Sequence, residues 1–359
     1  MPTRSQAPTT RPEAADDTPV LRIDSLNTAF QTRFGPVEVV NDASLTVHAG
    51  ESVAVVGESG SGKSVTALSV MGLLESTGEV THGSIRLRDR ELVGLSNRAY
   101  RAVRGRDVGM IFQDPTTCLD PVYTIGHQVT QAIRVHADRG RRAARERAVE
   151  LLTMVGIPDP ASRMSAYPHE LSGGQRQRVM IAIALACGPD LLIADEPTTA
   201  LDVTVQAQIL DLLRRTRREL GTALLLITHD LAVVSEVAER VVVMYAGQVV
   251  EQGPVADVLT APRHPYTAAL LRSVPPAVTD RSTRLRVIEG TVPSPHTMPD
   301  GCRFAPRCAH VMDRCVTEQP PLVAAPDGRD RRSRCWLADT DTPPAGSAPG
   351  TRATTEVPR

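Results

Sequence analysis

Four short runs of aliphatic residues recur along the middle of the chain. They are VAVVG (residues 53–57), VGMIF (108–112), LLIADE (191–196) and ALLLITH (223–229). Each run has the length and β-branched content of a buried strand, and segments with helical spacing separate the runs. Strands that alternate with helices pair in parallel, so the pattern predicts an α/β fold with a mainly parallel sheet flanked by helices.

Two further segments add detail to this fold. The insert from about residue 114 to 180 contains helical patterns such as ARERAVELLTMVG and no strong strand, so we expect a helical subdomain there. The segment RVVVMYAGQVVEQG (240–253) predicts a hairpin that turns at Ala246 and Gly247 and closes the main domain.

The two ends of the chain differ in composition from its middle. Residues 1–19 and 337–359 are rich in Pro, Thr, Ala and Gly and lack periodic apolar positions, which predicts disordered tails. From residue 254 onward prolines recur, as in TVPSPHTMPDG, so residues 254–336 are expected to form a second, small and loop-rich domain. The main domain then spans residues 20–253.

Charge and hydropathy limit the possible partners. Forty basic and 41 acidic residues give a formal net charge of -1, which provides no overall field for nucleic acid or an anionic membrane surface. The start of the chain has no apolar segment typical of a signal peptide. The longest apolar run, VMIAIALACG (179–188), is about half of the roughly 20 residues that span a bilayer. We expect a cytosolic chain that, at a membrane, depends on other subunits to cross it.

The segment GESGSGKS (57–64) fits the P-loop pattern G-x-x-x-x-G-K-[ST] between a predicted strand and a predicted helix. The glycines let backbone N–H groups converge on phosphate oxygens, and the helix adds its positive N-terminal end. Lys63 is expected to reach the β and γ phosphates, and the Ser64 hydroxyl to bind Mg²⁺. A nucleoside triphosphate is therefore the expected substrate.

The run LLIADE ends in two carboxylates, Asp195 and Glu196. Carboxylates at a strand end are costly unless a cation or a reacting group needs them. Together with the P-loop, they predict that Asp195 lies in the Mg²⁺ shell and that Glu196 polarises the attacking water as general base.

The order of these motifs resembles a known family. LSGGQ (171–175), placed between the P-loop and LLIADEPTTALD, is similar to the signature of the ATP-binding subunits of ABC transporters, and the resemblance covers about residues 20–253. It implies a P-loop NTPase core of ABC type in which two subunits enclose two ATP molecules, each signature facing the other subunit's P-loop. The nucleotide contacts it implies are Gly57, Glu58, Ser59, Gly60, Ser61, Gly62, Lys63, Ser64, Val65, Ser172, Gly173, Gly174, Gln175 and Asp202.

The resemblance also implies individual roles. Gln113 in IFQDP matches the Q-loop, which contacts Mg²⁺ or water, and His229 in LLITHD matches the switch histidine at the γ-phosphate. Asp202 matches the D-loop, which couples the two sites. The family stacks an aromatic ring on adenine, for which Phe30 is the first choice and Phe34 the second. The catalytic set is then Glu196, His229, Gln113 and Lys63, and the Mg²⁺ set is Ser64, Gln113 and Asp195.

Three segments point to one branch of this family. Resemblance to the ATP-binding subunits of the oligopeptide, dipeptide and nickel importers is found in IFQDPTTCLDPVYTIGHQ (111–128), YPHELSGGQRQRVMIAIALACGPDLLIADEPTTALDVTVQAQIL (167–210) and APRHPYTAALL (261–271), and HPYT is the most specific marker. The resemblance implies two membrane-spanning permease subunits, a second ATP-binding subunit that is a paralogue or a copy of this chain, and an extracytoplasmic substrate-binding protein. It places the chain at the cytoplasmic face of the membrane.

Two alternatives remain open at this point. The cargo is a di- or oligopeptide, or nickel or another small solute. A soluble ABC-type ATPase acting on nucleic acid or ribosomes is the alternative from another class; such proteins usually carry two ATPase cores or a long coiled-coil insert, and this chain has neither. The neutral charge also argues against a nucleic-acid footprint.

Six cysteines divide into two groups. Cys118 and Cys187 lie singly in the main domain and are expected to be small buried hydrophobes. Cys302, Cys308, Cys315 and Cys335 gather in the second domain, where four thiolates suit zinc or an iron-sulfur cluster. Their spacing alone decides little, and unmetallated thiols are the third possibility. GCRFAPRCAHVMDRC resembles the tail of dipeptide-type subunits that bind a [4Fe-4S] cluster, which implies that cofactor beside ATP and Mg²⁺.

Overall fold

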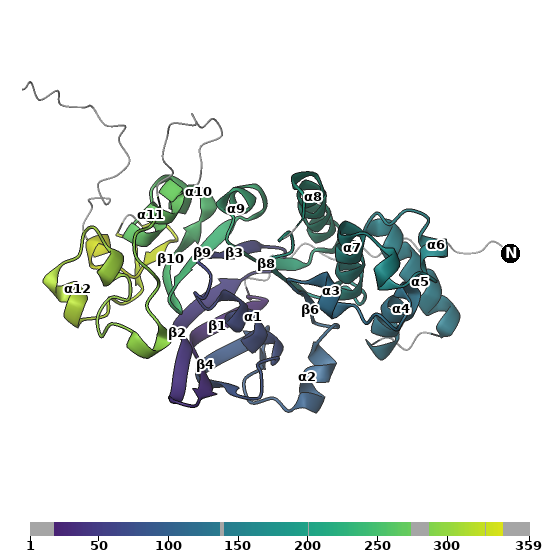
Figure 1. The fold of residues 1–359 in the computed structure, drawn as a ribbon, viewed down its shortest axis with the longest axis horizontal. Helices are drawn as coiled ribbons and strands as arrows, with labels where there is room; N and C mark the ends of the chain where they lie inside the picture. The colour runs from purple at the N-terminus through teal and green to yellow at the C-terminus, as the bar shows by residue number, and fades with distance from the viewer. Residues whose placement is uncertain (1–17, 137–139, 200, 274–286, 327, 340–359) are drawn as a thin grey trace, which may run out of the picture.

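The computed structural model describes residues 18–136, 140–199, 201–273, 287–326 and 328–339 (Figure 1). Of the tails expected to be disordered, residues 1–17 and 340–359 lie outside the described residues. The short remainders at 18–19 and 337–339 lie inside them.

A central sheet of eight strands runs through the molecule in the order β11-β12-β10-β9-β3-β8-β7-β6. Its parallel part consists of β9, β3, β8, β7 and β6. The bounds are β3 (Ser52–Val56), β6 (Val108–Ile111), β7 (Leu191–Asp195), β8 (Ala223–Thr228), β9 (Arg240–Tyr245), β10 (Gln248–Pro254), β11 (Val323–Ala324) and β12 (Arg332–Ser333). All four predicted strands and the predicted hairpin, β9 to β10, are confirmed.

A second, antiparallel sheet was not predicted. It has the order β2-β1-β4-β5, with β1 (Leu21–Thr32), β2 (Gly35–Val47), β4 (Gly78–Leu87) and β5 (Arg90–Glu91). The two sheets and α1 (Lys63–Met71) share one apolar core, because Ile23 and Ile85 of the antiparallel sheet cluster with Val55 and Ile193 of the parallel strands. Alternating half-buried positions in this sheet give a weaker sequence signal than the fully buried parallel strands.

The predicted helical subdomain is confirmed (Figure 1). Its elements are α3 (Pro115–Cys118), α4 (Ile125–His136), α5 (Arg141–Met154), α6 (Pro160–Arg163), the 3-10 turn η1 (Pro168–Glu170) and α7 (Gly173–Ala184). Val129, Leu151 and Ile181 pack in a core with residues of α8 (Val203–Leu220). The expectation that Cys118 is buried is wrong: it lies exposed at the end of α3, a helix too short to bury a face.

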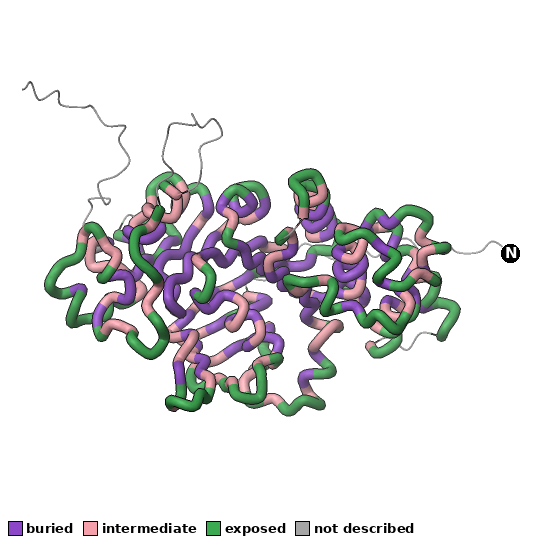
Figure 2. Tube along the Cα trace, viewed as in Figure 1, coloured by how far each residue is buried: buried purple, intermediate pink, exposed green. Residues whose placement is uncertain are grey.

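The C-terminal part continues the central sheet. Strand β12 pairs with β10, so the sheet does not stop at the predicted hairpin. Around it lie α10 (Val255–Thr260), α11 (Pro265–Ser273), η2 (Pro295–Thr297), η3 (Ala305–Arg307), α12 (Asp313–Thr317) and η4 (Trp336–Asp339). Tyr245, Tyr266 and Phe304 join the two parts in one apolar cluster, and Figure 2 shows buried positions running from the central strands into this lobe. The remaining helices are α2 (Asn97–Val103) and α9 (Leu231–Val237).

The parallel strands bring the predicted site residues to one edge. Gly57 follows β3, Gln113 follows β6, Glu196 follows β7 and His229 follows β8. In open α/β sheets this carboxyl edge is where ligands bind, because the strands end there and the loops are free to carry polar groups. Within the described residues no helix is both long and apolar enough to cross a membrane.

Candidate active site

The P-loop needs glycine at two positions for reasons visible in the backbone. Gly57 has φ of 156°, and a Cβ there would lie 2.1 Å from the carbonyl oxygen of Met244 on the neighbouring β9. Gly62, at the N-cap of α1, is in the left-handed region with φ of 95°. Only glycine adopts these conformations without strain. The loop therefore curls tightly at the start of α1, where its amides can face phosphate oxygens.

Lys63 lies beneath this loop. Its Nζ donates hydrogen bonds to the carbonyl oxygens of Gly57 at 2.8 Å and Glu58 at 2.9 Å, and the side chain is buried. Burial lowers the pKa of the ammonium from its usual value, while the carboxylates of Glu196 and Asp195 oppose that shift. Lys63 is also the single lysine in the sequence. The single lysine of the chain thus lies at the P-loop.

Ser64 and Asp195 come together as predicted. The Ser64 hydroxyl donates to Asp195 Oδ1 at 3.1 Å, across the gap between α1 and β7. Burial raises the pKa of the Asp195 carboxyl, which a bound cation would counteract. A hydroxyl and a carboxylate are hard oxygen ligands of the kind Mg²⁺ takes, so the donor set fits this ion.

Glu196 is the centre of a hydrogen-bonded group. Its carboxylate accepts from Gln113 Nε2 at 3.0 Å and from Thr199 Oγ1 at 2.9 Å, and His229 Nδ1 lies 3.2 Å from Oε1. Its backbone is in the left-handed region, with φ of 46°, which is uncommon for a residue other than glycine. Burial acts to raise the pKa of Glu196, but the bonds from Thr199 and His229 outweigh it and lower the pKa overall.

The predicted catalytic residues Gln113 and His229 thus both contact Glu196. In this arrangement Gln113 bonds to Glu196, while Ser64 bonds to Asp195. Thr199 was missed from the sequence. The sequence indicates this contact only by a hydroxyl residue three positions after Glu196. That spacing brings the hydroxyl to the carboxylate because the backbone of Glu196 is left-handed.

The signature segment begins helix α7. Ser172 is its N-cap and accepts a hydrogen bond from the Gln175 amide at 3.3 Å, while the Gln175 side chain accepts from the Ser172 amide at 3.0 Å. This reciprocal capping box explains why a glutamine stands three residues after the serine. Ser172 and Gly173 are exposed, and Figure 1 shows α7 and α1 in separate parts of the molecule. The anion-binding end of α7 therefore faces outward.

Asp202 caps the next helix, α8. Its side chain accepts from the Val205 amide at 2.9 Å. Helix capping by itself explains why an aspartate stands at this position. The role of Asp202 in coupling two subunits stays a prediction.

The two candidate aromatic rings differ in exposure. Phe30 is half-buried in β1, and its ring covers Gly78, where a Cβ would lie 2.6 Å from it. Phe34 stands in the turn between β1 and β2 and is 73% exposed. The Arg33 guanidinium lies 4.6 Å from the centre of the Phe34 ring. The Phe34 and His296 ring centroids lie 6.0 Å apart, so the exposed ring also has neighbours. Which ring stacks on adenine stays a prediction, with Phe30 as the first choice and Phe34 as the second.

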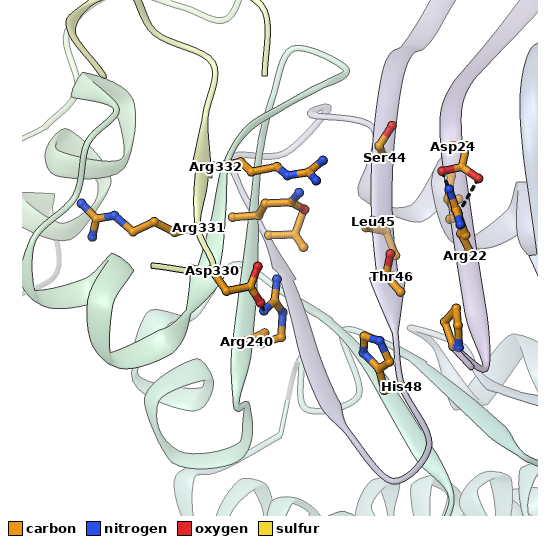
Figure 3. A pocket seen from close by; sticks show the side chains of 14 residues that line it. Arg22, Asp24, Ser44, Leu45, Thr46, His48, Arg240, Asp330, Arg331 and Arg332 are labelled. Carbon is orange, nitrogen blue, oxygen red and sulfur yellow. Dashed lines mark hydrogen bonds and ion pairs between the residues drawn. The ribbon is translucent and has the colours of Figure 1, made fainter. Parts of the chain in front are cut away.

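A hollow of about 410 Å³ opens between the two sheets but shares no lining residue with the P-loop (Figure 3). Two ion pairs lie within its lining: Arg22 donates to Asp24 at 2.8 Å, and Arg240 pairs with Asp330. Arg331 points away from the hollow in Figure 3. We therefore do not assign the nucleotide to it.

Four cysteines of the C-terminal part line one small cavity. Cys302, Cys308, Cys315 and Cys335 face it together with Trp336 and other residues. Burial, and then the neighbouring thiols, raise the pKa of Cys335 to about 12. The space between them is about 10 Å³, roughly the volume of one water-sized sphere. The four cysteines thus converge on one cavity, which in this structure has room for no more than a water-sized group. No group of three or more His, Cys, Asp or Glu side chains in the described ranges has a ready metal-binding arrangement.

The fold and this edge of the sheet define a P-loop ATPase of the ABC type. Residues 40–199 match the family model described as ABC transporter, and residues 250–315 match the model described as oligopeptide/dipeptide transporter, C-terminal region. The chain belongs to the ABC transporter family of ATP-binding proteins, and the predicted family and fold class are confirmed.

Individual relatives support the same assignment. The oligopeptide transport ATP-binding protein AppD of Bacillus subtilis is 50% identical over 90% of this chain and 98% of its own. The dipeptide transport ATP-binding protein DppD of Escherichia coli is 49% identical over 90% of this chain and 99% of its own. Among solved structures, the dimeric cassette MJ0796 with bound ADP and Pi covers 66% of this chain and 98% of its own, with 27% identity and a TM-score of 0.59.

Proposed function

We propose that this chain hydrolyses ATP to drive the import of di- or oligopeptides through an ABC transporter. The observation that carries the proposal is the match of residues 250–315 to the oligopeptide/dipeptide transporter C-terminal region, joined to a complete set of P-loop, signature and carboxylate motifs. Relatives similar over nearly their whole length are named as peptide transport proteins.

The proposal is tested by measuring the uptake of labelled dipeptide, longer peptide and Ni²⁺ by cells with and without this chain. If cells without this chain lose Ni²⁺ uptake but keep peptide uptake, the chain serves a nickel importer and the peptide proposal is wrong.

The catalytic roles follow from the contacts at the carboxyl edge. We propose that Lys63 and the loop amides bind the phosphates, that Ser64 and Asp195 hold Mg²⁺, and that Glu196 positions the attacking water with Gln113 and His229. Mg²⁺ would neutralise phosphate charge when bound. Because the pKa of Glu196 lies below its usual range, the side chain is ionised at neutral pH and can accept a hydrogen bond, and then a proton, from the attacking water as general base.

We propose that two ATP-binding subunits face each other, each supplying its signature to the other's P-loop. Two features support this: Ser172 at the start of α7 is exposed, and α7 lies apart from α1 in Figure 1. The helix end is an anion site that its own P-loop does not complete. The similar cassette MJ0796 is described as dimeric.

The membrane subunits are proposed to dock beside α4. A hollow of about 860 Å³ lies there, lined by Tyr123, His127, Val135 and Met164 among others. Val135 is 65% exposed and Tyr123 is 47% exposed, and the Tyr123 ring stacks on His127 with centroids 4.6 Å apart. We propose that a cytoplasmic segment of a permease subunit fills this hollow, with the ATPase at the cytoplasmic face of the membrane.

The Val135→Asp variant tests this docking surface. A carboxylate buried without a partner in the interface is expected to weaken binding to the membrane subunits by about tenfold or more. ATP hydrolysis by the isolated chain should stay near wild type. Copurification of tagged membrane subunits and peptide uptake measure the effect. Val287→Asp is the matched control, since Val287 is 76% exposed and lies outside this hollow. Equal losses in both variants would contradict the docking proposal.

We further propose that the four cysteines of the C-terminal part hold a metal centre, and that the centre is a [4Fe-4S] cluster. Their convergence on one cavity supports a four-thiolate site. Such a centre would stabilise a loop-rich part that has little apolar core of its own.

Metal analysis of anaerobically purified protein tests this assignment. About four irons and four acid-labile sulfides per chain are expected, with charge-transfer absorption in the visible region that Cys315→Ser abolishes. A content of one zinc per chain would show that the four cysteines form a structural zinc site and not a cluster. Absence of any metal would leave four free thiols and remove the proposal.

A further inference from the structure

The C-terminal part reaches into the P-loop. Arg307 donates two hydrogen bonds to the carboxylate of Glu58, Nη1 to Oε2 at 2.7 Å and Nη2 to Oε1 at 3.0 Å. The Arg307 side chain is 4% exposed and that of Glu58 27%. Glu58 is the second residue of the phosphate loop, and Arg307 lies 249 positions away in the sequence. A bidentate guanidinium and carboxylate pair fixes orientation as well as charge.

A second contact holds the backbone of the same residue. The Glu58 amide donates to the Tyr266 hydroxyl at 2.9 Å. Tyr266 is fully buried, and its ring packs on Tyr245 and Phe304 with centroids 4.6 and 5.4 Å away. Tyr266 is the tyrosine of the segment HPYT, so this contact gives a physical purpose to that motif. The C-terminal part thereby holds both the amide and the carboxylate of Glu58.

The third polar group of Glu58 faces the catalytic side. Its carbonyl oxygen accepts from Lys63 Nζ at 2.9 Å. Glu58 is therefore a single residue whose amide and carboxylate are held by the C-terminal part and whose carbonyl is held by the phosphate-binding lysine. The position of the Glu58 carbonyl, together with that of the Gly57 carbonyl, therefore helps to place the Lys63 ammonium.

Arg307 itself is held firmly enough to act as an anchor. Its Nε donates to the Glu289 carbonyl at 2.9 Å and Nη2 to the Ile288 carbonyl at 3.2 Å, and its guanidinium lies 5.7 Å from the centre of the Tyr245 ring. A parallel link runs from Arg303, which donates to the Ala246 carbonyl, to the Gly247 amide, which donates to the Ser61 carbonyl at 3.0 Å.

We propose that Arg307 is a positioning residue for the ATP site, through which the C-terminal part sets the affinity of the P-loop for ATP. This inference rests on the proposed ATPase function. The bond to Glu58 holds the first half of the loop in its curled shape and neutralises a carboxylate beside the phosphates. Without it, the loop would be freer and a negative charge would face an anionic ligand.

The test is ATP binding and steady-state hydrolysis by the full-length chain with Arg307→Ala. The KM and the Kd for ATP are expected to rise about tenfold, a change of about 1.4 kcal/mol, while kcat stays within about twofold of wild type because Glu196 is untouched. Arg307→Lys should recover part of the loss, since it keeps the charge but not the bidentate geometry. Arg329→Ala is the control: it removes an arginine of the same part, one that pairs with Asp257.

A double mutant separates positioning from general damage. If Arg307 acts through Glu58, the Arg307→Ala, Glu58→Gln variant should bind ATP no more weakly than Arg307→Ala alone. Additive losses, an unchanged KM, or a fall in kcat at constant KM would each overturn the proposal. Should Arg307→Ala fail to fold, Tyr266→Phe tests the same link by removing one hydroxyl, with a few-fold rise in KM expected. A wild-type chain without ATPase activity would instead refute the proposed function.

Discussion

Replacing Glu196 by glutamine is expected to lower the rate of ATP hydrolysis by roughly 10² to 10⁴ while leaving ATP binding intact. The side chain keeps its size and can still contact Gln113, Thr199 and His229, so the local structure is preserved. What is lost is a carboxylate that can accept hydrogen bonds from water with both oxygens. Single-turnover phosphate release, compared with equilibrium ATP binding, measures the two effects separately.

The same variant tests the paired arrangement of subunits. With hydrolysis blocked, the closed pair of subunits should accumulate when ATP is added. Light scattering would then show a doubling of the mass, or a complex with a second ATP-binding subunit when that subunit is supplied. Glu219→Gln is the control, because Glu219 is an exposed glutamate at the end of α8. Turnover near the wild-type rate in Glu196→Gln would remove Glu196 from its proposed role.

Lys63→Met is expected to have the second large effect. Removing the ammonium proposed to bind the phosphates should weaken ATP binding and hydrolysis together, by roughly 10² to 10³, the usual cost of losing one donor to a reacting anion. The free energy of unfolding should fall as well. The variant leaves the Gly57 and Glu58 carbonyls without their donor and removes the cation beside Asp195 and Glu196, and taking away one partner of buried polar groups destabilises the folded state.

Because the chain has a single lysine, this prediction has an unusual readout. Reductive methylation with labelled formaldehyde marks only Lys63 and the α-amino group, so the pKa of Lys63 can be followed directly by NMR. It should lie below the ordinary lysine value in the free protein and rise when ATP binds. Lys63→Arg provides the comparison, since a planar guanidinium cannot replace a compact ammonium in a tight loop. Wild-type ATP affinity in Lys63→Met would show that the ammonium is not a phosphate ligand.

Much of this molecule could be predicted because its key features are local in sequence. The parallel strands are continuous apolar runs, and the P-loop is one uninterrupted segment in which glycine, lysine and serine stand at fixed spacing. The antiparallel sheet was missed because its strands are half-exposed, with burial that shifts at bulges in β1. Thr199 was missed because its contact with Glu196 depends on a left-handed turn that residue type does not indicate.

Sequence spacing could not predict which aromatic ring is exposed near the start of the chain, nor where the central sheet ends. Phe30 and Phe34 are four positions apart in one strand and turn, and only the structure shows that Phe30 packs on Gly78 while Phe34 is exposed beside Arg33 and His296. The predicted boundary near residue 253 stays a prediction, while the sheet itself runs on from β10 to β12.

The sequence by itself determined the class of fold, the phosphate loop, the order of the catalytic motifs and the family, because each of these is written in short contiguous segments. Only the tertiary structure decided that Glu196 collects three polar partners, that the four cysteines share one cavity, and that Arg307 and Tyr266 hold the P-loop. Apart from Thr199 and the three cysteines of residues 302–315, these contacts join residues tens to hundreds of positions apart. Their formation depends on how strands order in the sheet and how the C-terminal part packs against β9, which no local pattern encodes.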